Sequence, residues 1–177
     1  MANLHSLISK IPTPVKQAIK DKLYPELIPE GETAPEWHLQ SWDQSWHRMR
    51  NTWSILVFYP GDDTPGCTKQ LQDFQDHYAE LKALGAEVYG INPAEAASHE
   101  SFANKFGFEF PILTDRGASV ARQFKCSLSV PFKTNVIRTV YLINPERRVR
   151  LANRGAPSVA ALVRSIQALQ QGTRDGM

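Results

Sequence analysis

One segment constrains the fold of this chain more than any other, because an apolar run leads directly into a helix start. Ser54–Tyr59 is apolar after its first residue, as is typical of a strand buried on both faces of a sheet. Turn-forming residues follow in Pro60-Gly61-Asp62-Asp63. Thr64-Pro65-Gly66 then suits a helix N-terminus, with Thr64 as N-cap and proline at the first helical position. A buried strand that turns into a helix predicts an α/β layer fold.

The rest of the main domain alternates in the same way. Strands are expected over 37–39, 54–59, 88–91, 111–115, 138–143 and 149–153, and helices over 65–83, 94–106, 117–125 and 158–170. The last two strands flank an Asn144-Pro145-Glu146 turn and form a predicted hairpin. The length of 177 residues suits one compact domain. We place this domain at residues 31–171 and a C-terminal tail at 172–177.

Residues 1–30 are predicted to be a short helical extension. Apolar residues fall on one helical face from Leu4 to Ile11, and again at Val15, Ile19 and Leu23. Prolines interrupt and close the segment. Two interpretations remain open: a pair of short helices packed on the body, or a surface for a second copy or another partner.

Composition excludes several classes of protein. The net charge of +2 with scattered basic residues does not indicate nucleic-acid binding, and no apolar run is long enough to span a membrane. A secretory signal is not expected at the N-terminus. The two cysteines, Cys67 and Cys126, are too few for a disulfide scaffold and indicate a reducing compartment, for which we expect the cytoplasm. The histidines lack metal-ligand spacing, so no metal site is predicted.

Cys67 is the candidate for chemistry. It falls at the third position of the predicted helix 65–83, where backbone N–H groups have no partner inside the helix and favour a negative charge. A cysteine at such a place becomes a nucleophilic thiolate. The alternative is that Cys67 only fills space as a small apolar residue.

The wider pattern resembles a known family. The spacing Pro60-x-x-x-Thr64-x-x-Cys67 resembles the signature of the peroxiredoxins of the AhpC/TSA family, and Phe-Tyr-Pro…Thr-Pro-Gly-Cys-Thr is similar to their PrxQ, or bacterioferritin-comigratory, branch. The opening at Gly31–Trp37, the segment Phe110–Asp115 and an arginine, Arg138, before Thr139–Ile143 also match in order. The resemblance covers about residues 31–170.

This resemblance implies a thioredoxin-like fold, a central mixed sheet flanked by helices, and peroxide reduction without a metal or organic cofactor. Cys67 would attack the peroxide and become a sulfenic acid, and the Thr64 hydroxyl would hydrogen-bond the sulfur and the peroxide. Arg138 would favour the thiolate and stabilise the developing negative oxygen. The amides of Gly66 and Cys67 would help to bind the substrate, and Pro60 would shield the sulfur.

The reductive half of such a cycle is less defined. Many members of the branch carry a resolving cysteine five residues after the peroxide-reactive one, but Gln72 stands there in this chain. Cys126 could resolve the sulfenic acid, could be a core residue, or could meet a second subunit's thiol. The expected reductant is thioredoxin, glutaredoxin or a small thiol, and the expected assembly is a monomer or homodimer. A peroxide-sensing module without efficient turnover is the alternative function.

Three polar residues near Cys67 carry further expectations. Gln70 stands where the family often has glutamate, so a hydrogen-bonding amide replaces a charge. Asp62 and Asp63 would oppose a thiolate if they pointed inward, and we therefore expect both to face solvent.

Overall fold

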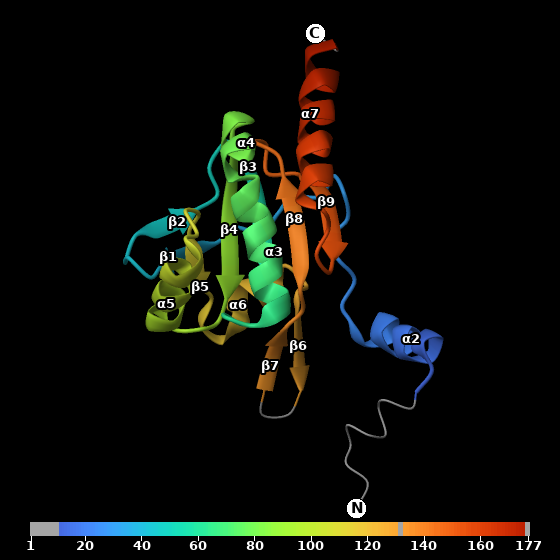
Figure 1. The fold of residues 1–177 in the computed structure, drawn as a ribbon. Coiled ribbons are helices and arrows are strands. Elements are labelled where there is room, and N and C mark those ends of the chain that lie inside the picture. The colour runs from blue at the N-terminus through green and yellow to red at the C-terminus, as the bar shows by residue number, and fades with distance from the viewer. Residues whose placement is uncertain (1–10, 131–132, 176–177) are drawn as a thin grey trace, which may run out of the picture.

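The computed structural model describes residues 11–130 and 133–175, and in these residues a mixed sheet is flanked by helices (Figure 1). The strands are β1 (His38–Ser41), β2 (Trp46–Arg48), β3 (Trp53–Phe58), β4 (Ala86–Asn92), β5 (Ile112–Thr114), β6 (Ser127–Val130), β7 (Lys133–Val136), β8 (Thr139–Ile143) and β9 (Val149–Arg154). Seven of them form one sheet in the order β2-β1-β5-β4-β3-β8-β9, and β6 and β7 form a separate hairpin. The central strand β3 pairs parallel with β4 and antiparallel with β8. The predicted α/β architecture with a mixed sheet is confirmed.

Helices lie on both faces of this sheet, and α2 (Thr13–Leu23) lies apart from it (Figure 1). The other helices are α3 (Pro65–Asp76), α4 (Tyr78–Ala83), α5 (Ala96–Phe106), the short 3₁₀ turn η1 (Arg116–Ala118), α6 (Ser119–Gln123) and α7 (Val159–Asp175). Side chains of α3, α4, α5 and α7 belong to one apolar cluster, and those of α6 belong to another.

The two clusters arise from the alternation of side chains along each strand. In β3, Ile55 and Val57 contribute to the first cluster, whereas Leu56 and Phe58 contribute to the second. Successive residues of a strand point to opposite faces of its sheet. The molecule therefore has two cores, and the sheet separates them.

Some element boundaries differ from the predicted ones. The helix expected over 65–83 is two helices, because His77 leaves helical geometry at φ −102° and ψ 5°. The segment predicted as a helix over 117–125 is η1 followed by the five-residue α6. Helix α7 runs to Asp175, beyond the expected end at Gln170. Strand β2 and the β6–β7 hairpin were not predicted, because their short segments lack a clear apolar alternation.

The N-terminal extension makes contact with the body through the residues that follow α2. Ile28 donates its backbone N–H to the Tyr141 hydroxyl over 3.1 Å, and Leu27 and Ile28 pack against the second core. Val15, Ile19 and Leu23 on α2 are instead 47%, 44% and 56% exposed. These three side chains do not pack on the body as the first interpretation expected. The predicted apolar face from Leu4 to Ile8 lies outside the described residues.

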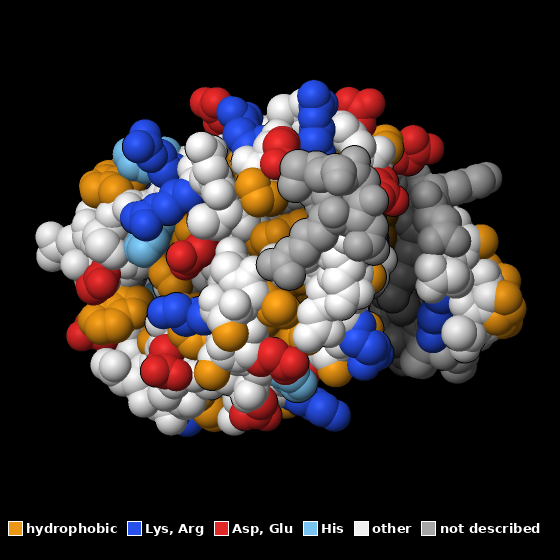
Figure 2. Space-filling view, turned by 90° about the horizontal axis from the view of Figure 1, so that it is seen from above, with side chains coloured by type: hydrophobic (Ala, Val, Ile, Leu, Met, Phe, Trp, Pro, Cys, Tyr) orange, Lys and Arg blue, Asp and Glu red, His pale blue; other side chains and the backbone are white. Residues whose placement is uncertain are grey.

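Charges of both signs are mixed on the surface. Figure 2 looks onto the end of the molecule at which α7 ends, and there Lys and Arg side chains alternate with Asp and Glu, without a broad patch of one sign. Within residues 11–130 and 133–175, no helix combines the length and apolar character that a bilayer span requires.

Candidate active site

The order of the strands brings Cys67 and Arg138 together. Helix α3 begins shortly after the end of β3, which places Cys67 beyond the carboxyl end of that strand. Strand β8 runs antiparallel beside β3, with Phe58 opposite Thr139. The residue before β8, Arg138, must therefore lie at the same edge of the sheet as the start of α3. Two residues that are 71 positions apart in sequence become neighbours.

The Arg138 guanidinium contacts the sulfur directly. Its Nη2 donates to Cys67 Sγ over 3.1 Å, and its Nη1 donates to the Gly66 carbonyl oxygen over 3.4 Å. Cys67 is only 1% exposed. A positive charge at hydrogen-bond distance in a site with little water can stabilise negative charge at or beside the sulfur.

The start of α3 adds backbone donors to this charge. Thr64 is the N-cap residue with extended geometry, at φ −93° and ψ 144°, but its side chain does not cap the helix. The amides of Gly66 and Cys67 find no acceptor among the residues that the structure describes. These N–H groups remain available to a bound oxygen, as the predicted substrate-binding role requires.

Gly66 lets the arginine approach the start of α3 closely. A Cβ atom at this position would lie 3.1 Å from Arg138 Nη2 and 3.3 Å from Nη1. The sequence suggested that Gly66 lets a ligand approach the backbone, and in the structure the group that approaches is the Arg138 side chain.

Thr64 and Pro60 flank the site without touching the sulfur. The Thr64 hydroxyl donates to the Gly61 carbonyl oxygen over a long 3.4 Å, and the predicted hydrogen bond to Cys67 is not formed in this structure. Pro60 is exposed and, together with Arg138, lines a cavity of about 830 Å³. Tyr24, Pro25 and other residues that follow α2 line the same cavity. The roles predicted for Thr64 and Pro60 remain predictions.

Cys126 lies on the other side of the sheet from Cys67. It is fully buried in the second core, whereas Cys67 belongs to the first. Its thiol donates to the Phe124 carbonyl oxygen over 3.1 Å, and burial raises the pKa of Cys126 to about 12. Both cysteines are free. A disulfide needs Cα atoms within about 7 Å, so pairing would require a large rearrangement. The geometry favours the core interpretation of Cys126.

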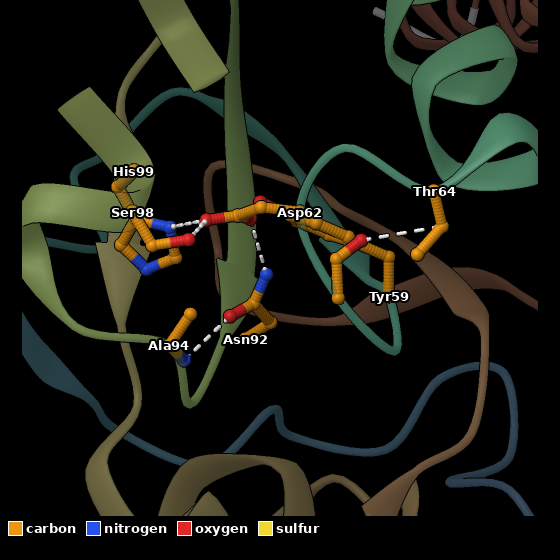
Figure 3. Close-up of polar contacts among 8 residues, drawn as sticks. Tyr59, Asp62, Thr64, Asn92, Ala94, Ser98 and His99 are labelled. Carbon is orange, nitrogen blue, oxygen red and sulfur yellow. Dashed lines mark hydrogen bonds and ion pairs between the residues drawn. The ribbon is translucent and has the colours of Figure 1, made fainter. Parts of the chain in front are cut away.

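The expectation that Asp62 faces solvent is wrong, whereas Asp63 does face solvent. The Asp62 side chain is 5% exposed and lies among Tyr59, Asn92, Ser98 and His99 (Figure 3). The Asp63 side chain is 52% exposed and pairs with Lys105. Sequence reasoning missed the Asp62 cluster because its partners lie as many as 37 positions away, and no local pattern indicates them.

Gln70 is buried close to Cys67 on the same helix. It is 5% exposed, and neither polar atom of its amide has a hydrogen-bond partner among the described residues. Among those same residues, no group of three or more His, Cys, Asp or Glu side chains is arranged to hold a metal ion. The chemistry of the site therefore centres on the Cys67 sulfur, the Arg138 guanidinium and the start of α3.

These features define a cysteine-centred site on a thioredoxin-like α/β fold. The profile of the AhpC/TSA family matches residues 31–152, and the chain belongs to this family. The resemblance suggested by the Thr64–Cys67 motif is confirmed.

Relatives with known names agree with this assignment. The chain is 35% identical over 122 residues to the chloroplastic peroxiredoxin Q of Triticum aestivum, a match covering 67% of this chain and 56% of the relative. It is 31% identical over 150 residues to the chloroplastic peroxiredoxin Q of Populus jackii, covering 83% of this chain and 68% of the relative. The match thus spans little more than half the length of the wheat protein.

Solved structures show the same fold. Peroxidoxin BcpB from Mycobacterium tuberculosis superimposes with a TM-score of 0.75 at 26% identity, over 80% of this chain and 97% of that one. A PrxQ variant from Xylella fastidiosa gives a TM-score of 0.72 at 25% identity, over 84% and 99% of the two chains. The predicted thioredoxin-like fold is confirmed.

Proposed function

We propose that this protein is a thiol-dependent peroxidase that reduces hydrogen peroxide or small organic hydroperoxides. The observation that carries the proposal is the 3.1 Å contact between Arg138 Nη2 and Cys67 Sγ at the start of α3. Membership of the AhpC/TSA family and the names of the relatives support it.

The first half-reaction follows from the groups around the sulfur. The Cys67 thiolate attacks one peroxide oxygen, an S–O bond forms and the O–O bond breaks. The sulfur becomes a sulfenic acid, and the departing oxygen takes a proton to leave as water or an alcohol. Arg138 and the free amides of Gly66 and Cys67 stabilise the negative charge that develops on this oxygen.

The second half-reaction requires an external thiol in our proposal. Gln72 cannot resolve the sulfenic acid, and Cys126 lies in the other core. A first reductant thiol attacks the oxidised sulfur, forms a mixed disulfide and releases water, and a second thiol then frees the Cys67 thiolate. Thioredoxin, glutaredoxin and small thiols are the candidate reductants. The cavity lined by Pro60 and Arg138 borders the residue that contacts the sulfur, and we propose that the reductant approaches from this side once the first turn of α3 moves.

Turnover tests the proposal. We expect the protein to consume many equivalents of hydrogen peroxide or tert-butyl hydroperoxide when thioredoxin and its reductase, glutaredoxin with glutathione, or dithiothreitol is supplied. Cys67→Ser should remove this activity completely. A variant that still consumed peroxide would exclude the proposed nucleophile, and a wild-type protein oxidised only once would favour the peroxide sensor.

Location and assembly are proposed separately. We propose a cytoplasmic protein, because both thiols are free and such thiols persist in a reducing compartment. Fluorescence microscopy of the tagged chain tests this location. A monomer or a homodimer is proposed for the assembly, and light scattering distinguishes the two. A dimer that disappears when Ile19 and Leu23 are changed to serine would assign its interface to α2.

A further inference from the structure

We propose that Asp62 is a positioning residue that latches the active-site loop to helix α5, and thereby sets how readily the first turn of α3 opens. The inference rests on the proposed peroxidase function only for its kinetic consequences. Here the active-site loop means the residues from Tyr59 to Thr64, which connect β3 to α3.

Asp62 is the centre of a saturated hydrogen-bond network. Its Oδ1 accepts from the Tyr59 hydroxyl over 2.7 Å and from Asn92 Nδ2 over 2.7 Å. Its Oδ2 accepts from Ser98 Oγ over 2.7 Å and from His99 Nδ1 over 2.8 Å. Figure 3 shows the carboxylate between Tyr59 on one side and Ser98, His99 and Asn92 on the other.

The four donors come from three parts of the fold. Tyr59 follows β3, Asn92 ends β4, and Ser98 and His99 lie in the first turns of α5. Asn92 is itself held, because its Oδ1 accepts from the Ala94 N–H over 2.6 Å. One carboxylate thus joins the active-site loop to the ends of two other elements.

The network keeps the buried carboxylate ionised. Burial by itself would raise the pKa of Asp62, but hydrogen bonds from His99, Ser98 and Tyr59 and the attraction of His99 lower it overall. His99 is fully buried, and its Nε2 has no partner among the described residues.

The latch acts on Cys67 through the short chain between them. Thr64 links the loop to α3, because its carbonyl oxygen accepts the Thr68 N–H over 2.8 Å. Cys67 is 1% exposed, so a protein reductant reaches its sulfur only after the first turn of α3 moves. Peroxide reaction instead requires the closed arrangement, in which Arg138 contacts the sulfur. Weakening the latch should therefore slow oxidation of Cys67 without slowing its reduction by a bulky thiol.

The neighbouring carboxylate provides a matched control. Asp63→Asn makes the same chemical change one residue away, at a side chain that is 52% exposed and pairs with the exposed Lys105. Such surface pairs contribute little to stability. Asp63 has a positive φ of 52°, which asparagine tolerates well.

Hydrogen exchange tests the latch without relying on peroxidase activity. We expect amide exchange in residues 59–71 to rise about tenfold in Asp62→Asn, because two donors then face an amide N–H₂ instead of a carboxylate oxygen. Asp63→Asn should match wild type. If both variants exchange like wild type, or if exchange in Asp62→Asn rises equally over the whole chain, there is no local latch.

Single-turnover kinetics test the effect of the Asp62 latch on the two half-reactions. We expect Asp62→Asn to lower the rate of Cys67 oxidation by roughly 10- to 100-fold, because the reacting groups lose their alignment. Reduction of the oxidised protein by thioredoxin should stay within about twofold of wild type or become faster. Equal losses in both half-reactions, or none, would overturn the kinetic role.

A milder variant covers the case in which Asp62→Asn does not fold. Ser98→Ala removes one of the two donors to Oδ2 and should produce the same pattern with a smaller change, of about threefold in each readout. The absence of any local change in exchange would then overturn the proposal. A wild-type protein that fails to react with peroxide would reject the proposed function, whereas the exchange experiment would still decide the latch.

Discussion

The two cysteines of this chain occupy equally buried places but have different polar surroundings. Cys67 is 1% exposed and Cys126 is 0% exposed, on opposite faces of the sheet. Each has an arginine nearby. Arg138 donates to the Cys67 sulfur, whereas the Arg154 guanidinium donates to the Pro25 and Lys125 carbonyl oxygens and to the Thr139 hydroxyl.

The difference shows that burial does not by itself make a cysteine reactive or inert. At Cys126, burial dominates and raises the pKa of the thiol to about 12, and interactions with the Thr139 hydroxyl and the Arg154 charge only partly offset it. At Cys67, the guanidinium and the start of α3 supply donors at the sulfur itself. The direction in which nearby donors point therefore distinguishes the surroundings of Cys67 from those of Cys126.

The largest expected effect is on oxidation of the two sulfurs. With a limited amount of hydrogen peroxide, mass spectrometry should find oxidised Cys67 and unmodified Cys126. Cys67→Ser should lose all peroxidase activity, and Cys126→Ser should retain most of it with an external thiol. An internal Cys67–Cys126 disulfide in the wild-type protein would reverse our interpretation of Cys126.

Substitutions of Arg138 should have the next largest effect, a decrease in the rate of reaction with peroxide. Arg138→Ala removes the positive charge from the sulfur, and we expect the second-order rate constant for peroxide to fall by about 10²- to 10³-fold. Arg138→Lys keeps the charge but loses the planar fork, so the loss should be about tenfold. Stopped-flow kinetics measure both.

Arg116→Ala is the matched control for the arginine variants. This arginine is 79% exposed and pairs with an exposed Glu95. Removing the Arg116 side chain should change the second-order rate constant for peroxide by less than about twofold. A comparable loss in this control would mean that net charge, rather than the contact with Cys67, supports the reaction.

Gly66→Ala should separate activity from stability. The new methyl group would lie 3.1 Å from Arg138 Nη2 and displace the guanidinium from the sulfur. We expect the peroxide rate constant to fall by about three- to tenfold, while thermal stability stays level or rises, because alanine favours a helix more than glycine does. An unchanged rate would show that Arg138 adjusts without losing its contact.

The smallest effect concerns Cys126 at alkaline pH. Its thiol is protonated in the folded state up to a pKa of about 12, but in the unfolded chain it ionises near pH 8.5. Its contribution to stability is therefore complete below about pH 8.5 and decreases above it by up to about 1.4 kcal/mol per pH unit. Urea unfolding between pH 8 and 10.5 should show that the free energy of unfolding falls more steeply with pH in wild type than in Cys126→Ala. If the free energies of unfolding of the two proteins changed in parallel with pH, the buried environment described for Cys126 would be wrong.

Much of the fold was predictable because its signals are local. The apolar run Ser54–Tyr59 predicted β3 to within one residue at each end, and the Thr64-Pro65-Gly66 helix start predicted the beginning of α3 at Pro65. Long apolar or periodic segments gave β4, α5, β8 and β9 in the same way. Short elements such as β2 and the β6–β7 hairpin could not be predicted, since three or four residues hold too little periodicity and form only through pairing with other strands.

Sequence by itself determined the helix start that carries Cys67, because caps, proline and the first-turn amides act over a few residues. Tertiary structure alone decided which distant groups meet that element. Strand order places Arg138 against the sulfur over a separation of 71 residues, turns Asp62 inward toward His99, and puts Cys126 on the far face. The physical reason is that side chains alternate across a sheet, so a residue's face and neighbours depend on its register in the assembled strands.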